Sequence, residues 1–357
     1  MSTSRSIASL LLVTALGFAG CGKDDDSKPA RLSVRGADIL DPDGAPIVLR
    51  GWNWGQWGTV QPGDAADHVQ QGATVVRIPL RWWGNWGDGS IDARKDDAPG
   101  HIDPDHLAVL DQMIQSATEQ HLWVDLFVDS NCGQASVDND TIADCGTGAD
   151  GLAANFMNDA ATKQKFVEVW EFLAARYAKT PYIAWYEILP EPNFTCTKDG
   201  CTDWSAAPAF YASIIPVVRA IDPRTPILVG PAGGYLLRKI DTAYIAGVDG
   251  LIYTGNLLNS ASQKPDLVAA ATDFRTAHQV PVFVQQVGVR QAEPDASTAA
   301  TTILSLLNQD GIGWTWWTYR EQHSKGDGYA PMWLDDAGAW RQNGDWLTVI
   351  STQLAAP

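Results

Sequence analysis

The chain has 357 residues, of which 45% are hydrophobic and 19% charged, a composition that is typical of globular proteins and argues against disorder. Its 42 acidic and 25 basic residues give a formal net charge of −17. Phosphate backbones and anionic lipid surfaces repel such a chain, so we expect no nucleic-acid partner. The 16 tryptophans are more than a core usually needs, and we expect some of them on a binding surface.

The first 30 residues are expected to be a targeting signal and a tether rather than part of a fold. Arg5 precedes an apolar run over 7–20 that is too short to span a bilayer. Small residues follow Phe18 and lead directly into Cys21, which resembles a bacterial lipoprotein signal with cleavage before Cys21 and lipid on its thiol. Such signals usually have Leu where this chain has Phe18, and an ordinary secretory signal is the alternative. We therefore expect an exported protein whose lipid anchor at Cys21 holds it to a membrane in the cell envelope or at the cell surface, with 21–30 as a flexible tether.

From residue 31 onward, short apolar runs alternate with longer amphipathic stretches. Strands are predicted at 47–51, 74–79, 122–128, 183–189, 226–230, 250–254, 281–287 and 312–319, the first introduced by a turn at 41–44. Helices are predicted at 104–120, 153–178, 210–220, 267–277, 296–307 and 346–354. This alternation predicts an α/β fold, a (β/α)8 TIM barrel forming a single domain over 31–357. A doubly wound sheet is the alternative, but no glycine-rich phosphate loop follows the first strand.

Four further cysteines form two local pairs in the body of the chain. Cys132 and Cys145 bracket one polar loop, and Cys196 and Cys201 bracket a shorter one. An even number of cysteines in an exported protein predicts a disulfide in each loop. No histidine lies near either pair, which disfavours a zinc site, and the acidic first loop lacks the spacing of a calcium-binding EF-hand. We expect no metal and no cofactor.

Polar residues collect at the C-terminal ends of the predicted strands, where barrels of this kind have their active sites. Arg77 lies in the second strand and Asp129 follows the third. Glu191 follows the fourth strand, and Gln286 lies near the end of the seventh. The sequence therefore predicts that these side chains meet at one mouth of the barrel.

Five segments resemble strand motifs of glycoside hydrolase family 5, the cellulase-like family, in the right order. They are LRGWN at 49–53, VRIP at 76–79, YEILPEP at 186–192, PVFVQQVG at 281–288 and WTWW at 314–317. The resemblance implies a carbohydrate substrate, with Glu191 as the general acid/base, Arg77 as the support of the catalytic carboxylate and Trp317 as the floor of a sugar subsite. We further expect contacts to the sugar from Trp316, Asn53, Trp54, Asn256 and Asp129, because the C–H faces of pyranoses are apolar and their hydroxyls need polar partners.

The chain departs from the family pattern in its chemistry. The position of the family nucleophile, a glutamate, holds Gln286, and the asparagine before the acid/base is replaced by Pro190. Phe127 and Val128 stand where the family has histidines on the third strand. A retaining glycosidase needs two carboxyl groups, and an amide cannot form a stable glycosyl ester. This alignment therefore excludes retaining hydrolysis through Gln286.

Three interpretations remain open. In the first, another carboxylate serves, for example Asp129 as the base for water in an inverting reaction. The other carboxylates near predicted strand ends are Asp125, Glu187, Glu293 and Glu321. In the second, a 2-acetamido sugar attacks through its own carbonyl oxygen while Gln286 orients it and Glu191 protonates the leaving group. In the third, the protein is a non-hydrolytic, glycan-binding pseudoenzyme of the cell envelope. We expect a monomer in each case.

Overall fold

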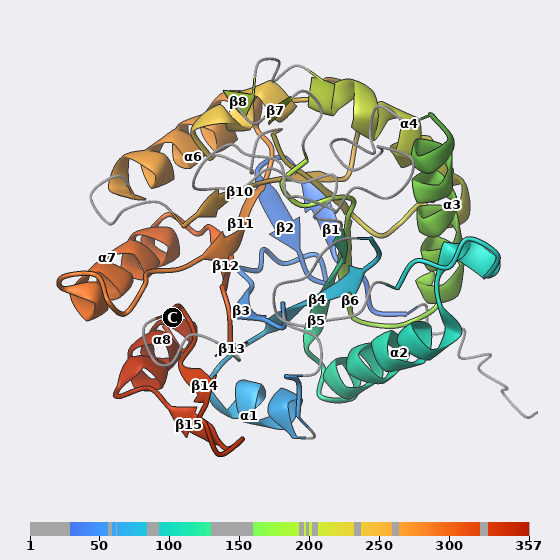
Figure 1. Ribbon diagram of the computed structural model, residues 1–357. Coiled ribbons are helices and arrows are strands. Elements are labelled where there is room, and N and C mark those ends of the chain that lie inside the picture. The colour runs from blue at the N-terminus through green and yellow to red at the C-terminus, as the bar shows by residue number, and fades with distance from the viewer. Residues whose placement is uncertain are drawn as a thin grey trace, which may run out of the picture.

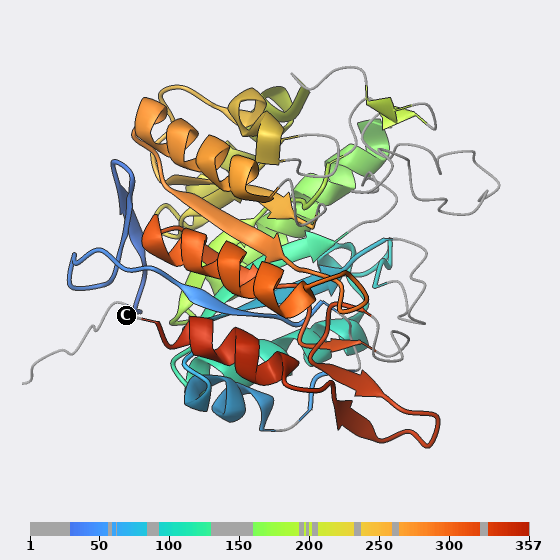
Figure 2. The same cartoon turned by 90° about the vertical axis from the view of Figure 1, so that its left-hand side faces the viewer.

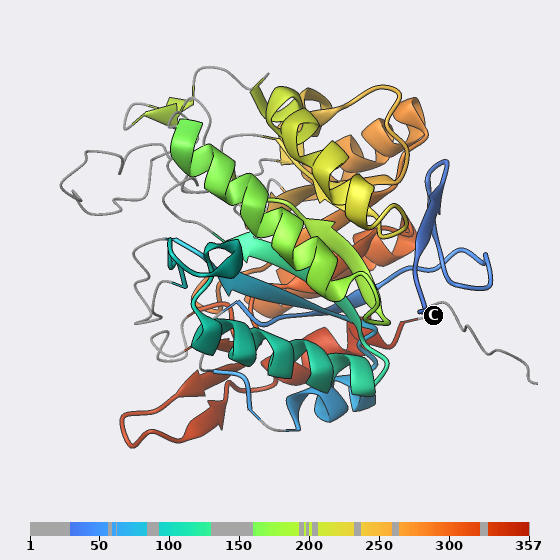
Figure 3. The same ribbon diagram turned by 90° about the vertical axis from the view of Figure 1, so that its right-hand side faces the viewer.

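The computed structural model describes residues 29–55, 59–61, 63–83, 93–129, 160–192, 196–197, 200–201, 206–231, 237–258, 264–321 and 328–356. Figure 1 looks along the axis of a ring of strands surrounded by helices, and Figures 2 and 3 show the same molecule from two sides. In the described part of the chain, no helix is both long enough and apolar enough to cross a membrane.

Eight parallel strands close into a barrel in the order β10-β11-β12-β3-β4-β5-β6-β9. The first four along the chain are β3 (Arg50–Asn53), β4 (Val75–Arg81), β5 (Trp123–Asp129) and β6 (Ile183–Glu187). The last four are β9 (Ile227–Val229), β10 (Leu251–Leu257), β11 (Val282–Val287) and β12 (Gly313–Trp316). Pairing of β12 with β3 closes the ring and confirms the predicted (β/α)8 barrel over the doubly wound alternative.

Helices surround the barrel and cover the outer faces of its strands (Figure 1). They are α1 (Asp64–Gln70), α2 (Pro104–Glu119), α3 (Ala160–Tyr177), α4 (Ala206–Ile221), α6 (Lys264–His278), α7 (Ala296–Gln309) and α8 (Trp346–Leu354), with 3-10 turns η1 (Pro99–His101) and η4 (Leu237–Ala243). The start of α2 shows why the sequence predicted a helix beginning at Pro104. Asp103 accepts a hydrogen bond from the backbone N–H of Asp105, and Pro104 occupies the first turn, where no N–H is needed.

Short elements were missed by the sequence analysis because they carry too few residues to show a period. They include α1 and η4. They also include the strands β13 (Arg320–Glu321), β14 (Met332–Leu334) and β15 (Trp340–Gln342), and these three strands form a separate small sheet. The turn predicted at 41–44 is present, but the hairpin beside it pairs β1 (Ser33–Arg35) with β2 (Asp38–Leu40). The segment after the turn makes only an isolated bridge from Pro46 to Leu40 before β3 begins.

The interior of the barrel has a lower, apolar layer at the N-terminal ends of the strands. Its members come from almost every strand and pack in one cluster: Leu32, Ile39, Leu49, Val75, Trp123, Ala184, Trp185, Leu228, Ile252 and Phe283. Leu32 and Ile39 belong to the β1–β2 hairpin region, which lies at the end of the barrel opposite the strand arrowheads (Figures 2 and 3). Arg31 ties this hairpin to the end of α3 by donating to the carbonyls of Tyr177 and Ala178 at 3.1 and 2.8 Å. The bottom of the barrel is therefore closed, and chemistry is confined to the other end.

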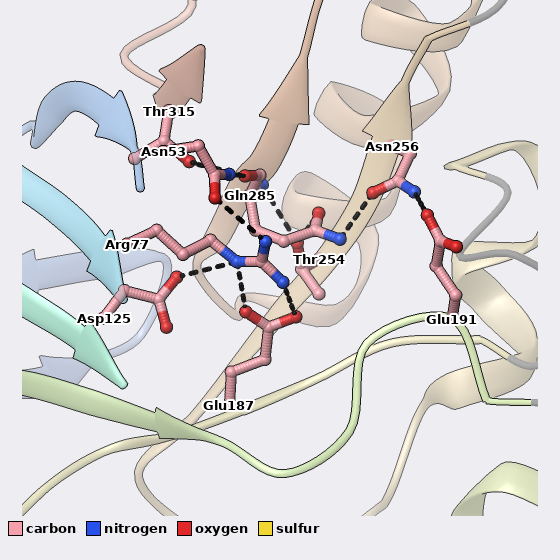
Figure 4. Close-up of polar contacts among 9 residues, drawn as sticks. All are labelled: Asn53, Arg77, Asp125, Glu187, Glu191, Thr254, Asn256, Gln285 and Thr315. Atoms are coloured by element: carbon pink, nitrogen blue, oxygen red, sulfur yellow. Dashed lines mark hydrogen bonds and ion pairs between the residues drawn. The ribbon is translucent and has the colours of Figure 1, made fainter. Parts of the chain in front are cut away.

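The upper layer of the interior is polar. On five strands, a polar residue lies two positions after an apolar residue of the lower layer, so both side chains point inward. These polar residues are Arg77, Asp125, Glu187, Thr254 and Gln285, and none of them is exposed to solvent. Asn53 and Thr315 join them from β3 and β12 (Figure 4). A polar interior layer directly below the mouth is the frame on which the site is built.

Candidate active site

Arg77 is the centre of the polar layer. Its Nε and Nη2 donate to the two carboxylate oxygens of Glu187 at 2.6 and 2.8 Å, which is a bidentate ion pair. Its Nε lies 3.5 Å from Asp125 Oδ2, and its Nη1 donates to Asn53 Oδ1 at 3.3 Å. The guanidinium carbon lies 3.6 Å from the centroid of the Phe127 ring, an arrangement that adds a cation–π contact. Figure 4 shows Glu187, Asp125 and Asn53 converging on the guanidinium.

Two buried carboxyl groups share this single cation. Burial raises the pKa of Asp125 well above its ordinary value, and the negative charge of Glu187 adds to the effect. Burial also raises the pKa of Glu187, although the Arg77 guanidinium opposes that shift. Because Glu187 holds the bidentate contact, Arg77 stabilises the charged form of Glu187 more than that of Asp125. Both groups are therefore occupied below the mouth and are excluded as the second catalytic carboxylate.

Glu191 stands above this layer, four residues after β6. Its backbone adopts a left-handed conformation with φ of 50°, which is uncommon for a residue with a side chain. The side chain is partly buried, and its Oε1 accepts a hydrogen bond from Asn256 Nδ2. Burial and the negative charge of Asp129 raise the pKa of Glu191 to about 8. The group therefore holds a proton at neutral pH, as a general acid must.

Gln286 lies between Arg77 and Glu191, where the sequence alignment places the nucleophile. Its neighbours orient the amide so that its oxygen accepts from Arg77 Nη1 at 3.1 Å and its nitrogen lies 3.2 Å from Glu191 Oε1. Arg77, Gln286 and Glu191 therefore lie in sequence across the mouth of the barrel. A carboxylate could accept from Arg77 in the same way, but only an amide can also donate to Glu191.

Asp129 and Trp317 lie at the rim of the site. Asp129 ends β5, is 8% exposed, and has its Oδ2 4.0 Å from Arg81 Nε. Trp317 follows β12 and is partly exposed. A Cβ atom on Gly55 would lie 2.3 Å from the Trp317 ring, so the glycine allows the ring to approach closely the chain that follows β3.

Four residues expected to contact the sugar are buried, namely Trp316, Trp54, Asn53 and Asn256. Trp316 is fully buried among the outer helices, where its Nε1 donates to the carbonyl of Tyr329 at 2.9 Å. Trp54 is 2% exposed and donates to His68 Nε2 at 2.9 Å. A ring covered on both faces cannot stack on a sugar. Asn53 is buried too, and its side chain serves Arg77 and the carbonyl of Gln285.

Asn256 is fully buried, but it belongs to the site because it contacts Glu191 directly. The sequence analysis missed its buried neighbours, of which Gln285 and Thr254 are the most important here. A signal for Gln285 was present, since two successive glutamines at 285–286 break the alternation expected of a strand.

Two other carboxylates considered as catalytic have structural partners. Glu321 is 9% exposed, and its Oε2 accepts from the backbone N–H groups of Tyr329 and Ala330 at 3.1 and 3.4 Å. Glu293 accepts from the backbone N–H of Arg290 at 3.3 Å. Neither contact points to a role in proton transfer. Across the described residues, no three His, Cys, Asp or Glu side chains are grouped so that they could hold a metal ion.

Of the four cysteines expected to form disulfides, Cys132 and Cys145 lie outside the described residues. Cys196 in β7 (Cys196–Thr197) pairs with Cys201 in β8 (Gly200–Cys201), directly opposite in an antiparallel register. The disulfide between them stays a prediction. Cys21 also lies outside the described residues.

The family comparison decides what kind of barrel this is. A family model described as Cellulase (glycosyl hydrolase family 5) matches residues 40–323. The chain belongs to glycosyl hydrolase family 5. The match runs from the β1–β2 hairpin to the end of β13, so it includes every strand of the barrel and each residue described at the mouth.

Two curated relatives of the chain are endoglucanases. Endoglucanase CelA of Streptomyces lividans is 29% identical over 167 residues, which cover 44% of this chain and 34% of that protein. Endoglucanase MaCel5A of Microbulbifer sp. (strain ALW1) is 23% identical over 346 residues, which cover 88% of this chain and 58% of that protein. The chain therefore spans between about a third and three fifths of the length of these relatives.

A solved structure from Thermobifida fusca has the same fold. It is the catalytic domain of endoglucanase Cel5A, in a glutamate-to-glutamine variant complexed with cellotetraose. The two superimpose with a TM-score of 0.62 at 19% identity, covering 90% of this chain and 96% of the other.

Removing the positive charge of Arg77 tests whether the polar layer depends on it. Arg77→Met should destabilise the family 5 barrel by about 3–5 kcal/mol, because it leaves Glu187 buried without a partner. Chemical denaturation measures this loss. The control is Arg341→Met, which breaks an exposed ion pair with Asp335 and should leave the free energy of unfolding nearly unchanged. Equal effects of the two substitutions would contradict the ion cluster described here.

Proposed function

We propose that this chain binds a poly- or oligosaccharide at the mouth of its barrel and acts on O-glycosidic bonds with Glu191 as the general acid. One observation carries the proposal, namely that a partly buried carboxyl group with a pKa of about 8 stands at the mouth. Such a group still holds its proton at neutral pH and can deliver it to the oxygen of a leaving sugar. The family 5 fold supports the choice of substrate class.

Gln286 determines which route the reaction takes. An amide carries no negative charge and forms no stable ester with the anomeric carbon, so cleavage does not pass through a covalent intermediate at this residue. Its neutral amide links Arg77 to Glu191 instead. The attacking group then comes from water or from the substrate.

Asp129 is the residue that we propose as the base for an attacking water. It ends β5, next to β6 in the barrel, and its charge is close enough to raise the pKa of Glu191. A protonated Glu191 beside an ionised Asp129 is the division of roles that acid and base catalysis requires. This route inverts the anomeric configuration. Retention of configuration would instead indicate attack by the substrate's own 2-acetamido group.

β-Glucans are the first substrates to consider. Two relatives are endoglucanases, and the Thermobifida fusca structure holds cellotetraose. Trp317 supports a pyranose ligand, since its partly exposed ring offers an apolar surface to the C–H face of a sugar.

Glycan binding without turnover is the second candidate. The contact between Gln286 and Glu191 favours it, because their nearest polar atoms lie 3.2 Å apart. The carboxyl groups of a retaining pair stand about 5–5.5 Å apart with the anomeric carbon between them. In this interpretation Glu191 is a hydrogen-bonding residue for a bound sugar, and the barrel is a pseudoenzyme of the cell envelope.

The general-acid role predicts a pH profile. Release of reducing sugar from β-glucans should fall as the pH rises through about 8, because Glu191 loses the proton it must donate. Glu191→Gln should lower the rate by about 10²–10⁴-fold. Its control is Glu171→Gln on the exposed side of α3, which should leave the rate unchanged. Glycan binding with no sugar release would establish the second candidate, whereas release that is insensitive to Glu191→Gln would overturn the assignment of the acid.

Restoring a carboxylate at position 286 gives a second test. Gln286→Glu places an acceptor where Arg77 Nη1 already donates, so hydrolysis with retained anomeric configuration should appear. NMR of the first-formed product distinguishes retention from inversion. The shorter Gln286→Asp carries the same charge but falls short of the anomeric carbon, so it serves as the control. A folded Gln286→Glu protein that yields no retained product would show that more than the nucleophile is missing.

We also propose that the protein is exported and anchored through lipid on Cys21. The first described residue, Pro29, leads into the hairpin region that closes the bottom of the barrel. An anchor joined there places the membrane on the side away from the mouth, so the substrate site faces outward. This orientation suits a protein that meets large polysaccharides.

Loss of the lipid acceptor should release the protein. Cys21→Ala expressed in a bacterial host should move from the membrane fraction to the soluble fraction of the envelope, because one thioether lipid anchor carries several acyl chains and two such chains are needed for stable attachment. Cell fractionation with immunoblotting measures this. Ser27→Ala in the same segment should stay with the membrane. If the protein that retains Cys21 were found only in the soluble fraction, the result would favour an ordinary secretory signal.

A further inference from the structure

Strand β11 contains an extra residue at the level of the site. Between Thr254 and Asn256, β10 advances by two residues, while its partners on β11 advance by three, from Phe283 to Gln286. The pairing of β11 with β12 shifts in the same segment, between Val284 and Val287. Such a β-bulge breaks the alternation of side chains along a strand. Gln285 and Gln286 can therefore both turn toward the interior, where an ordinary strand would turn only one of them.

A chain of hydrogen bonds leads from Gln285 to the acid. The hydroxyl of Thr254 donates to Gln285 Oε1 at 2.8 Å, and Gln285 Nε2 donates to Asn256 Oδ1. Asn256 Nδ2 in turn donates to Glu191 Oε1. Thr254, Gln285 and Asn256 are all fully buried (Figure 4). Among these four hydrogen-bonded residues, Glu191 alone is partly exposed and so able to meet a ligand.

The direction of this chain follows from the chemistry of its members. An isolated asparagine amide can point either its oxygen or its nitrogen at a carboxyl group, and the two choices have opposite effects. The Gln285 amide nitrogen can only donate, so it holds the oxygen of Asn256 on its own side. The hydroxyl of Thr254 donates to Gln285 Oε1 at 2.8 Å and accepts from the Gln285 backbone N–H at 3.3 Å, so the oxygen of the Gln285 amide lies on the Thr254 side and its nitrogen on the Asn256 side. The amide nitrogen of Asn256 is therefore directed at Glu191.

We propose that Gln285 is a positioning residue for Glu191, acting through Asn256. Donors from Asn256 and Gln286 meet the same oxygen, Oε1, so the proton of the carboxyl group resides on the other oxygen, Oε2. The hydrogen bond from Asn256 also opposes the rise of the Glu191 pKa. This assignment rests on the proposed role of Glu191 as the proton donor, but its test does not require turnover.

The test is the titration of Glu191 followed by NMR of protein labelled with ¹³C at glutamate side-chain carboxyl carbons. Glu191→Gln identifies the signal by removing it. Gln285→Met keeps the length of the side chain but removes the donor to Asn256 Oδ1, so the midpoint should rise, by at most about two pH units for one hydrogen bond to a charged group. The charged groups that act on Glu191, which are Asp129, Arg77 and Glu187, are left in place.

A double-substitution cycle separates the relay from an indirect effect. Asn256→Leu should raise the midpoint at least as much as Gln285→Met, and adding Gln285→Met to Asn256→Leu should produce no further shift. Gln112→Met, on the exposed side of α2, is the control and should leave the midpoint unchanged. A midpoint unmoved by Gln285→Met in a protein with unchanged circular dichroism would overturn the proposal. The proposal would also be overturned if Gln285→Met shifted the midpoint equally in the presence and in the absence of Asn256→Leu. Because the titration needs no substrate, failure of the relay can be distinguished from absence of hydrolysis.

Discussion

The ion pair between Arg77 and Glu187 is the interaction on which the upper half of the barrel depends. A guanidinium does not lose its proton inside a protein, so Arg77 must be balanced where it stands. Glu187 supplies the charge, while Asn53 and the ring of Phe127 occupy other sides of the cation. These partners come from the neighbouring strands β3, β5 and β6. Placing a cation in the interior thus obliges the surrounding strands to contribute polar side chains, and an apolar layer becomes impossible at this level.

The same charge balance explains why an amide is accommodated at position 286. Arg77 already faces Glu187 and Asp125, and Asp129 lies near the mouth, so a further carboxylate would add negative charge to a crowded site. The amide of Gln286 accepts from Arg77 without adding charge and can also donate to Glu191. The Gln286 amide completes the hydrogen-bond network between Arg77 and Glu191, but it is not a nucleophile. Proton donation by Glu191 is compatible with that network, and formation of a glycosyl ester is not.

Strand positions and the barrel were predictable because the lower layer repeats a simple pattern. Val75, Ile252 and Phe283 are apolar inward residues, each followed two positions later by a polar one, and each alternation marks a strand that points its chemistry toward the mouth. Period alone could not tell which of two adjacent residues points inward. Trp316 faces the helices and Trp317 faces the rim, although both looked equally suited to bind a sugar. The bulge in β11 could not be predicted either, because it is defined by pairing with β10 and β12 rather than by local composition.

That bulge has a consequence for the direction of hydrogen bonding across the mouth. Carboxylates accept from any donor, so a site built from them tolerates several arrangements, whereas an amide has one accepting and one donating end. Gln285 and Asn256 are linked in series, so the orientation of the first sets that of the second. Thr254 starts the series from a position held by the backbone of β11. The extra residue in β11 is thereby coupled to Glu191, and the atom of Glu191 that carries a proton is set by backbone geometry rather than by a neighbouring charge.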